Sequence, residues 1–129
     1  MLVREAFRDA KISHRLHVAE DGVIALQFLR RQDKFLAVPS PDLILLDLNL
    51  PRKDGREVLA EIKQDEELRK IPVIVLTTSE DESDIEKAYS LHANSYLTKP
   101  VDMDEFIHSV HLIEEFWLRL ACLPRRLPA

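Results

Sequence analysis

The sequence predicts an α/β fold built on a parallel β-sheet, and three observations support this prediction. Two apolar segments, residues 42–47 and 71–78, lack the polar alternation of a half-exposed strand, which is typical of strands buried on both faces. Between them, Asp54-Gly55 precedes apolar residues at helical spacing, namely Val58, Leu59 and Ile62. A strand, a helix and a second strand in this order predict a βαβ crossover, which is right-handed in nearly all known cases.

The rest of the chain repeats this alternation of strands and helices. Aspartate at the start of a helical pattern predicts an N-cap, because its carboxylate accepts a hydrogen bond from the first helical turn. In chain order we expect a strand over 14–19, a helix begun by Asp21-Gly22, a loop over 32–41, a helix from the acidic residues 80–84 to about Leu91, a strand over 95–98 and a closing helix from Asp102.

Length and composition limit the protein to a single domain of an ordinary globular kind. Of the 129 residues, 46% are apolar and 32% are charged, which excludes a disordered chain or a disulfide scaffold. We expect one domain over residues 1–121 and a C-terminal tail over 122–129. The net charge of −5 argues against a nucleic-acid surface. The apolar runs are too short for a membrane span, and the single Cys122 suits a cytoplasmic protein.

Three polar residues, Asp47, Thr77 and Lys99, close three of the predicted strands. In open parallel sheets, ligands bind at the carboxyl ends of the strands. A carboxylate can accept a phosphoryl group, and a hydroxyl and an ammonium can stabilise the charge on the transferring oxygens. Each residue alone has a plain structural explanation, as a turn cap, a strand end or a solvated lysine. Together they predict a phosphoryl site.

Residues 43–51, followed by Asp54-Gly55, resemble the phosphorylation segment of receiver domains in two-component response regulators. The spacing to Thr77 and to Lys99-Pro100 agrees with that family, and the resemblance extends from about residue 2 to 121. Segments 56–63 and 113–118 are similar to stand-alone regulators that partner cyanobacterial and bacterial phytochrome kinases. The resemblance implies a flavodoxin-like, doubly wound parallel sheet with strand order 2-1-3-4-5.

The resemblance also implies roles for the strand-end residues. Asp47 is expected to be the phosphoacceptor, which takes its phosphoryl group from a phosphohistidine of a sensor histidine kinase. Asp47 and the backbone carbonyl of Asn49 are expected to bind Mg²⁺. Thr77 is expected to donate a hydrogen bond to the phosphoryl group, and Lys99 to neutralise another of its oxygens.

A switch is implied as well. Tyr96 corresponds to an aromatic residue whose ring follows the Thr77 hydroxyl, and Pro100 is expected to follow a cis peptide bond. The new charge on Asp47 biases this two-state element. The expected output is a protein–protein contact, so we predict a signalling protein and not an enzyme.

The amino-terminal sequence departs from the family pattern. Receivers begin with an apolar strand and an acidic pair that holds the metal, whereas residues 1–7 here match the middle of the first helix. We therefore expect weakened or lost Mg²⁺ binding and slow or absent phosphorylation, with Met1 an internal methionine or the chain shortened. The missing strand would remove about 10 kcal/mol of apolar burial, so pairing should be rearranged, swapped or replaced by dimer contacts.

Two further groups of residues have local explanations. Asp21 is expected to be an N-cap and not a metal ligand, and the acidic residues at 80–84 to be a solvated cluster favoured by the helix dipole. The histidines at 108 and 111 are expected to lie on solvated helix faces.

The closing helix carries an apolar stripe that is expected to lie in the core. It consists of Phe106, Val110, Ile113, Trp117 and Leu120. Its far end, with Phe116 and Trp117, extends beyond what a short sheet covers, so we also predict a homodimer.

Two other functions remain open at this point. One is a phosphorylation-independent binding module, a pseudo-receiver, because the acidic pair is missing. The other is a phosphatase resembling haloacid dehalogenases, which use a strand-end Asp, a Thr and a Lys. Such enzymes need a second carboxylate two residues after the nucleophile, and Asn49 stands there.

Overall fold

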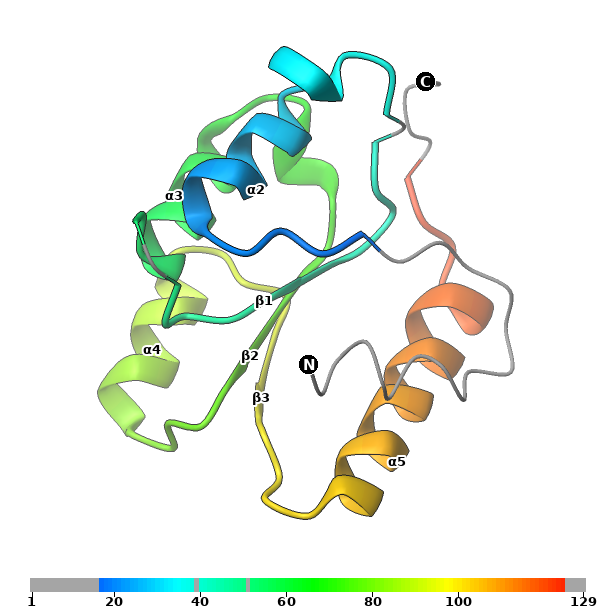
Figure 1. The fold of residues 1–129 in the computed structure, drawn as a ribbon. Coiled ribbons are helices and arrows are strands. Elements are labelled where there is room, and N and C mark those ends of the chain that lie inside the picture. Colours follow the sequence, from blue (N-terminus) through cyan, green and yellow to red (C-terminus); the bar gives the residue numbers. More distant parts are fainter. Residues whose placement is uncertain (1–16, 39, 51, 125–129) are drawn as a thin grey trace. The chain divides into compact units, whose positions relative to one another are not determined.

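The computed structural model describes residues 17–38, 40–50 and 52–124 (Figure 1). The described residues divide into two compact units, one holding residues 19–98 and the other holding residues 99–123. The first unit contains the sheet and helices α2 to α4. The second contains α5, Met103–Ile113, and the π-helical segment η3, Glu114–Leu120.

The described sheet has three parallel strands in the order β1-β2-β3. They are β1, Ile44–Leu46, β2, Val73–Thr77, and β3, Ser95–Thr98. Every residue of the central strand β2 is buried, which explains its unbroken apolar and β-branched sequence. The strands predicted over 42–47, 71–78 and 95–98 are confirmed, and so is the α/β fold class.

Three helices alternate with these strands. They are α2, Gly22–Leu29, α3, Gly55–Gln64, and α4, Glu82–Ser90, with short 3₁₀ turns at η1, Asp33–Phe35, and η2, Leu68–Lys70. Within this unit, α2, α3 and α4 lie on one side of the sheet (Figure 1). The predicted stripe of α3 is at most 1% exposed and belongs to the main core. None of the described helices combines the length and the apolar character that crossing a bilayer requires.

Each helix of more than one turn before η3 begins at an aspartate that caps it. The side chains of Asp21, Asp54, Asp81 and Asp102 accept hydrogen bonds from backbone N–H groups of the first turn. Such caps satisfy amides that have no partner within the helix. The prediction that Asp21 is an N-cap is therefore confirmed, with its Oδ1 2.8 Å from the amide of Ile24.

The prediction of a strand over 14–19 is wrong for residues 17–19, the part of this segment that the structure describes. Residues 17–19 have no strand structure, and residues 14–16 lie outside the described residues. A strand exists only through hydrogen bonds to a neighbour. Within the described part of the chain the sheet ends at β1, so residues 17–19 have no strand to pair with.

The predicted stripe of the closing helix holds only for its first part. Phe106, Val110 and Ile113 are buried, whereas Leu120 is 75% exposed. The reason is the change to π-helix at Glu114. A π-helix bonds each residue to the fifth along instead of the fourth, so the spacing no longer keeps these side chains on one face.

The loop from β1 to α3 is held by two very close backbone approaches. A Cβ on Gly55 would lie 2.3 Å from the carbonyl oxygen of Asp47, and a Cβ on Gly22 would lie 2.1 Å from that of Lys53. Both distances are far below van der Waals contact, so only glycine fits. The two Asp-Gly pairs thus cap α2 and α3 and also let both helix starts pack against this loop.

Ion pairs add further ties between the loop and the two helices. Arg52, with a left-handed φ of 67°, donates to Asp21 at 3.2 Å. Glu61 of α3 binds Arg30, the C-cap residue of α2, at 2.9 Å and also binds Lys53 of the loop. The hydrogen bond from Lys53, together with the contribution of Arg30, lowers the pKa of Glu61 despite opposing partial burial.

We predict that Gly55→Ala lowers the free energy of unfolding by about 1–3 kcal/mol, because the new methyl group collides with backbone atoms. Urea unfolding measures this change. Gln64→Ala, at an exposed position of the same helix, is the control and should stay within about 0.5 kcal/mol of wild type. Equal stability of the two variants would refute the close packing.

We predict that Glu61→Gln reduces stability at neutral pH and that its effect shrinks in acid. The pKa of Glu61 in the folded protein lies below its ordinary value of 4.5, so its stabilising contribution is complete above pH 4.5 and is lost as the pH falls through the folded pKa. Unfolding free energies from neutral pH down to pH 3 test this. A wild-type-to-variant difference that does not change with pH would contradict it.

Candidate functional site

The candidate site begins with two residues that leave neighbouring strands at the same sheet edge. Asp47 follows β1 directly, and Thr77 is the last residue of β2. Leu46 pairs with Val75 in the parallel register, so both strands end at corresponding levels. Thr77 is 1% exposed, whereas Asp47 is partly exposed. Asp47 is thus partly accessible to solvent, and Thr77 is buried at the same edge of the sheet.

The Asp47 carboxylate is oriented by the loop that follows it. Its Oδ1 accepts a hydrogen bond from the backbone amide of Asn49 at 2.9 Å. This bond folds the loop back over the strand end and brings the backbone of Asn49 close to the carboxylate. Asn49 itself is exposed.

The Thr77 hydroxyl is linked to Tyr96 through Ser79. The amide of Ser79 donates to Thr77 Oγ1 at 3.3 Å. The hydroxyl of Tyr96 donates to the carbonyl of Ser79 at 3.0 Å, and Tyr96 pairs with Val75 in the sheet. The two residues expected to form a switch are therefore joined by two hydrogen bonds through one intervening residue.

Lys99 follows Thr98, the last residue of β3, which pairs with Thr77. Lys99 is also the first residue of the second compact unit. The cis peptide bond expected before Pro100 is wrong, since the described residues contain no cis peptide bond. The trans form is favoured before proline by about 0.5–1 kcal/mol, and here the chain keeps it.

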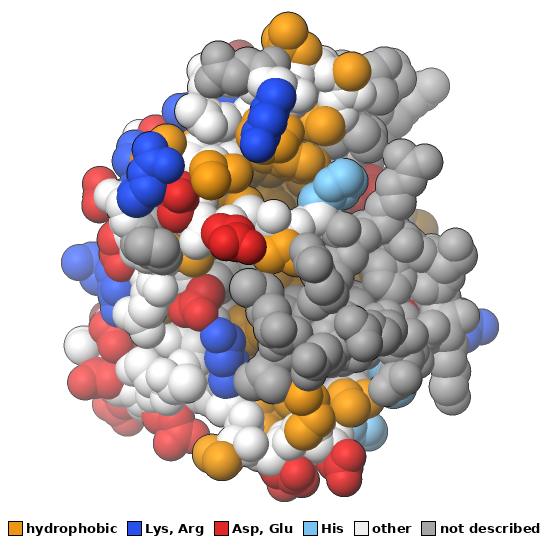
Figure 2. Space-filling view, viewed as in Figure 1, with side chains coloured by type: hydrophobic (Ala, Val, Ile, Leu, Met, Phe, Trp, Pro, Cys, Tyr) orange, Lys and Arg blue, Asp and Glu red, His pale blue; other side chains and the backbone are white. Residues whose placement is uncertain are grey.

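The acidic residues around α4 have local partners. Asp81 accepts hydrogen bonds from the amide and hydroxyl of Ser83, which lower the pKa of Asp81. Asp84 pairs with Arg56 at 3.2 Å. Figure 2 shows carboxylates gathered at the surface over α4. Glu80, Asp81 and Glu82 are exposed, as the predicted solvated cluster requires, whereas Asp84 is partly buried in its ion pair.

The oxygen atoms available to a metal at this edge come from one loop. The Asp47 carboxylate and the Asn49 carbonyl are hard oxygen donors, the type that Mg²⁺ prefers, and Mg²⁺ commonly uses one or two carboxylates with phosphate and water. The donor set therefore fits a hydrated Mg²⁺. In the described part of the chain, no three His, Cys, Asp or Glu residues gather where they could hold a metal.

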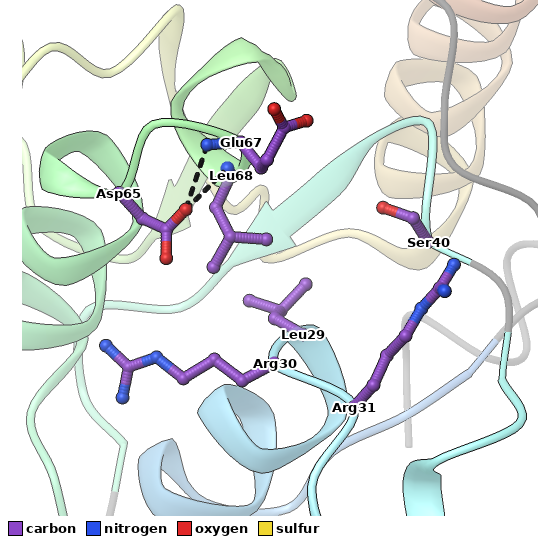
Figure 3. A pocket seen from close by; sticks show the side chains of 7 residues that line it. All are labelled: Leu29, Arg30, Arg31, Ser40, Asp65, Glu67 and Leu68. Carbon is purple, nitrogen blue, oxygen red and sulfur yellow. Dashed lines mark hydrogen bonds between the residues drawn. The ribbon is translucent and has the colours of Figure 1, made fainter.

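A separate cavity of about 300 Å³ lies between the carboxyl ends of α2 and α3 (Figure 3). One of its walls is the turn after α3, in which Asp65 Oδ1 accepts hydrogen bonds from the amides of Glu67 and Leu68 at 2.9 and 3.1 Å. None of the predicted site residues is among its lining residues, which are Leu29, Arg30, Arg31, Ser40, Asp65, Glu67 and Leu68. The candidate site is thus a sheet edge, distinct from this cavity.

Sequence reasoning missed three residues beside the site. Ser79, Asp84 and Arg56 form a hydrogen-bonded series that leads from the Thr77 loop to α3. A signal existed, because Arg56 and Asp84 each stand in the first turn of a helix that follows a strand. The topology brings both helix starts to the same edge of the sheet.

Known proteins are similar to this chain in both sequence and fold. Response regulator Rcp1 of Synechocystis sp. is 50% identical over 123 residues, which are 95% of this chain and 84% of Rcp1. The Mn²⁺-bound structure of Rcp1 superposes with a TM-score of 0.89 over 96% of this chain and 89% of that one. The phosphorylated cyanobacterial phytochrome response regulator RcpA is 48% identical and has a TM-score of 0.91 over the same shares of the two chains.

The model of the response regulator receiver domain matches residues 1–111. The relatives, the parallel sheet and the alternating helices agree with that match. Divalent metal binding and phosphorylation both occur among these relatives, as the Rcp1 and RcpA structures record. This chain therefore belongs to the receiver domains of two-component response regulators.

Proposed function

We propose that Asp47 is the residue of this receiver that accepts the phosphoryl group. An Asp47 carboxylate oxygen attacks the phosphorus of a kinase phosphohistidine, the new O–P bond forms, the P–N bond breaks, and the imidazole nitrogen keeps the bonding pair and takes a proton from water. The observation that carries this proposal is the register of β1 and β2. Because of this register, Asp47 and Thr77 lie at the same edge of the sheet. The phosphorylated relative RcpA supports it.

The neighbouring residues are assigned by their chemistry. Thr77 donates a hydrogen bond to one phosphoryl oxygen, and Lys99 neutralises another, because charge on the transferring oxygens needs donors and cations. Asp47 and the Asn49 carbonyl hold Mg²⁺, which supplies further charge neutralisation when bound. We expect weak Mg²⁺ binding, because the oxygen donors described at this edge, the Asp47 carboxylate and the Asn49 carbonyl, come from one loop and include a single carboxylate.

The response to phosphorylation is proposed to pass through Thr77 and Tyr96. A phosphoryl group adds about −1.5 to −2 charges, and Thr77 reorients toward it. Tyr96 follows through Ser79, and the strand end at Lys99-Pro100 carries the change onward. The output is a protein–protein contact made by a cytoplasmic, non-enzymatic receiver over residues 1–121, with 122–129 as a tail.

The phosphoryl donor is proposed to be a sensor histidine kinase of the phytochrome type. RcpA is a cyanobacterial phytochrome response regulator, and it matches 96% of this chain at 48% identity. Similar sequence over nearly the whole chain includes the surfaces that a kinase would contact. Phosphoryl transfer from a purified phytochrome kinase to this chain, compared with transfer from an unrelated histidine kinase, tests the assignment.

One other function has a specific observation in its favour. A binding module that works without phosphorylation would need no metal, and Asp47 is the one carboxylate that the β1–α3 loop is described as presenting beside the Asn49 backbone. A phosphatase of the haloacid dehalogenase kind is less well supported, because the amide of Asn49 stands where its general acid would be.

A homodimer through α5 and η3 is also proposed. Leu112, Phe116 and Leu120 are 55%, 50% and 75% exposed, and such apolar side chains are typical of contact surfaces. Leu112→Glu should shift the sedimentation coefficient toward that of a monomer, while Glu105→Gln, an exposed control on α5, should not. A monomeric wild-type protein would refute the dimer.

We predict that acetyl phosphate with Mg²⁺ increases the intact mass of the protein by one phosphoryl group, and that Asp47→Asn abolishes the increase. The mass change should need more Mg²⁺ than Rcp1 needs under the same conditions, and a chelator should prevent it. Peptide mapping should place the group on Asp47.

Two alternative outcomes separate the competing functions. An unchanged mass at every Mg²⁺ concentration would contradict the phosphoacceptor proposal and favour the binding module. Continuous turnover of a phosphomonoester would instead indicate the phosphatase.

A further inference from the structure

Ser79 is the point where four hydrogen bonds of the β2–α4 loop meet. Its amide donates to Thr77 Oγ1 at 3.3 Å, and its carbonyl accepts from Tyr96 at 3.0 Å. Its hydroxyl donates to Asp84 Oδ2 at 2.8 Å and accepts from the amide of Asp81 at 3.2 Å. The position of Ser79 therefore determines where the amide that donates to the Thr77 hydroxyl lies.

Asp84 is in turn held by Arg56, which belongs to a different helix. Arg56 Nη2 lies 3.2 Å from Asp84 Oδ1, and Arg56 Nη1 lies 3.4 Å from both carboxylate oxygens of Asp54. Partial burial alone would lower the pKa of Arg56, but the hydrogen bonds to Asp84 and Asp54 outweigh it and raise the pKa. The side chains of Arg56 and Asp84 are 28% and 30% exposed, so the pair is partly shielded from water.

The direction of the Thr77 hydroxyl follows from this arrangement. A threonine hydroxyl has one hydrogen to donate and two lone pairs that accept. The Ser79 amide takes one lone pair, so the O–H hydrogen must point elsewhere. It is then available for an acceptor such as a phosphoryl oxygen on Asp47.

We infer that Arg56 and Asp84 are positioning residues for phosphoryl acceptance: their ion pair holds Ser79, and Ser79 holds the Thr77 hydroxyl ready to donate. This inference rests on the proposed function of Asp47. Neither residue needs to touch the phosphoryl group. They act by fixing the loop that presents the donor, in the way that residues behind a metal ligand or catalytic group fix its orientation.

The test compares phosphorylation rates by acetyl phosphate in three variants, Arg56→Gln, Asp84→Ala and Ser79→Ala. Each removes one side-chain contact of the series from Arg56 to Ser79. We expect each to lower the rate at saturating acetyl phosphate about tenfold, with a smaller effect on the acetyl phosphate concentration that gives half the maximal rate. Arg56→Lys, which keeps a positive charge, should recover part of the loss.

Double variants test whether the three residues act in series. If Arg56 acts through Asp84, and Asp84 through Ser79, then Arg56→Gln/Asp84→Ala and Asp84→Ala/Ser79→Ala should be no slower than the slower single variant. If the rate decreases of the two single variants multiply in a double variant, the residues do not act in series. Arg30→Gln is the matched control, because Arg30 forms an ion pair with Glu61 at 2.9 Å and similar exposure, away from the Thr77 loop. It should keep the wild-type rate.

A second measurement does not depend on phosphorylation. In the unphosphorylated protein, Arg56→Gln should move the amide NMR signals of Thr77 and Ser79, while Arg30→Gln should leave them in place. Unmoved signals would overturn the inference. Urea unfolding of each variant shows that the chain is folded under the assay conditions.

The failure of this inference can be told apart from the failure of the proposed function. If wild type is phosphorylated and the three single variants react at the wild-type rate, only the positioning role is wrong. If wild type is not phosphorylated at all, the phosphoacceptor proposal fails, and the positioning role fails with it.

Discussion

The parallel register of β1, β2 and β3 is the constraint on which the rest of the site depends. Leu46 pairs with Val75, and Thr77 pairs with Thr98, so the chain leaves all three strands at one edge. A slip by one residue would turn the buried side chains of β2 to the opposite face. Because β2 is buried throughout, the core itself sets where Asp47 and Thr77 stand. Their positions need no direct contact between the two residues.

The two sides of the site are held in place by two different kinds of contact. On the Asp47 side, the support is backbone packing, because Gly22 and Gly55 admit carbonyl groups where a Cβ would collide. On the Thr77 side, the support is a series of polar contacts that ends in an ion pair between α3 and α4. Close backbone packing is hard to displace, whereas an ion pair and a hydroxyl can rearrange. Under the proposed function, the phosphoryl acceptor Asp47 is thus held rigidly while the donor Thr77 can adjust, which suits a phosphorylation-dependent switch.

Much of the fold could be predicted because its signals are local. Unbroken apolar runs predicted β1 and β2, the continuing alternation of strands and helices predicted β3, and the Asp-Gly pairs predicted the starts of α2 and α3. The strand expected at 14–19 is absent over residues 17–19, because alternation within a segment says nothing about whether a neighbouring strand exists. The change to π-helix at Glu114 is a change of hydrogen-bond spacing that apolar spacing does not report. The contact of Arg56 with Asp84 joins residues 28 positions apart, and only the folded chain brings them together. The candidate site residues were predicted from strand ends, whereas Arg56 and Asp84, which we propose orient Thr77, were not.

The central claim is that Asp47, Thr77 and Lys99 act on one phosphoryl group. The most direct measurement is a crystal structure of the protein with Mg²⁺ and beryllofluoride, which mimics an aspartyl phosphate. We expect beryllium bonded to an Asp47 carboxylate oxygen, with Thr77 Oγ1 and Lys99 Nζ each within hydrogen-bond distance of a fluorine. A Lys99 ammonium on another side of the molecule, or beryllofluoride bound to a different residue, would contradict it.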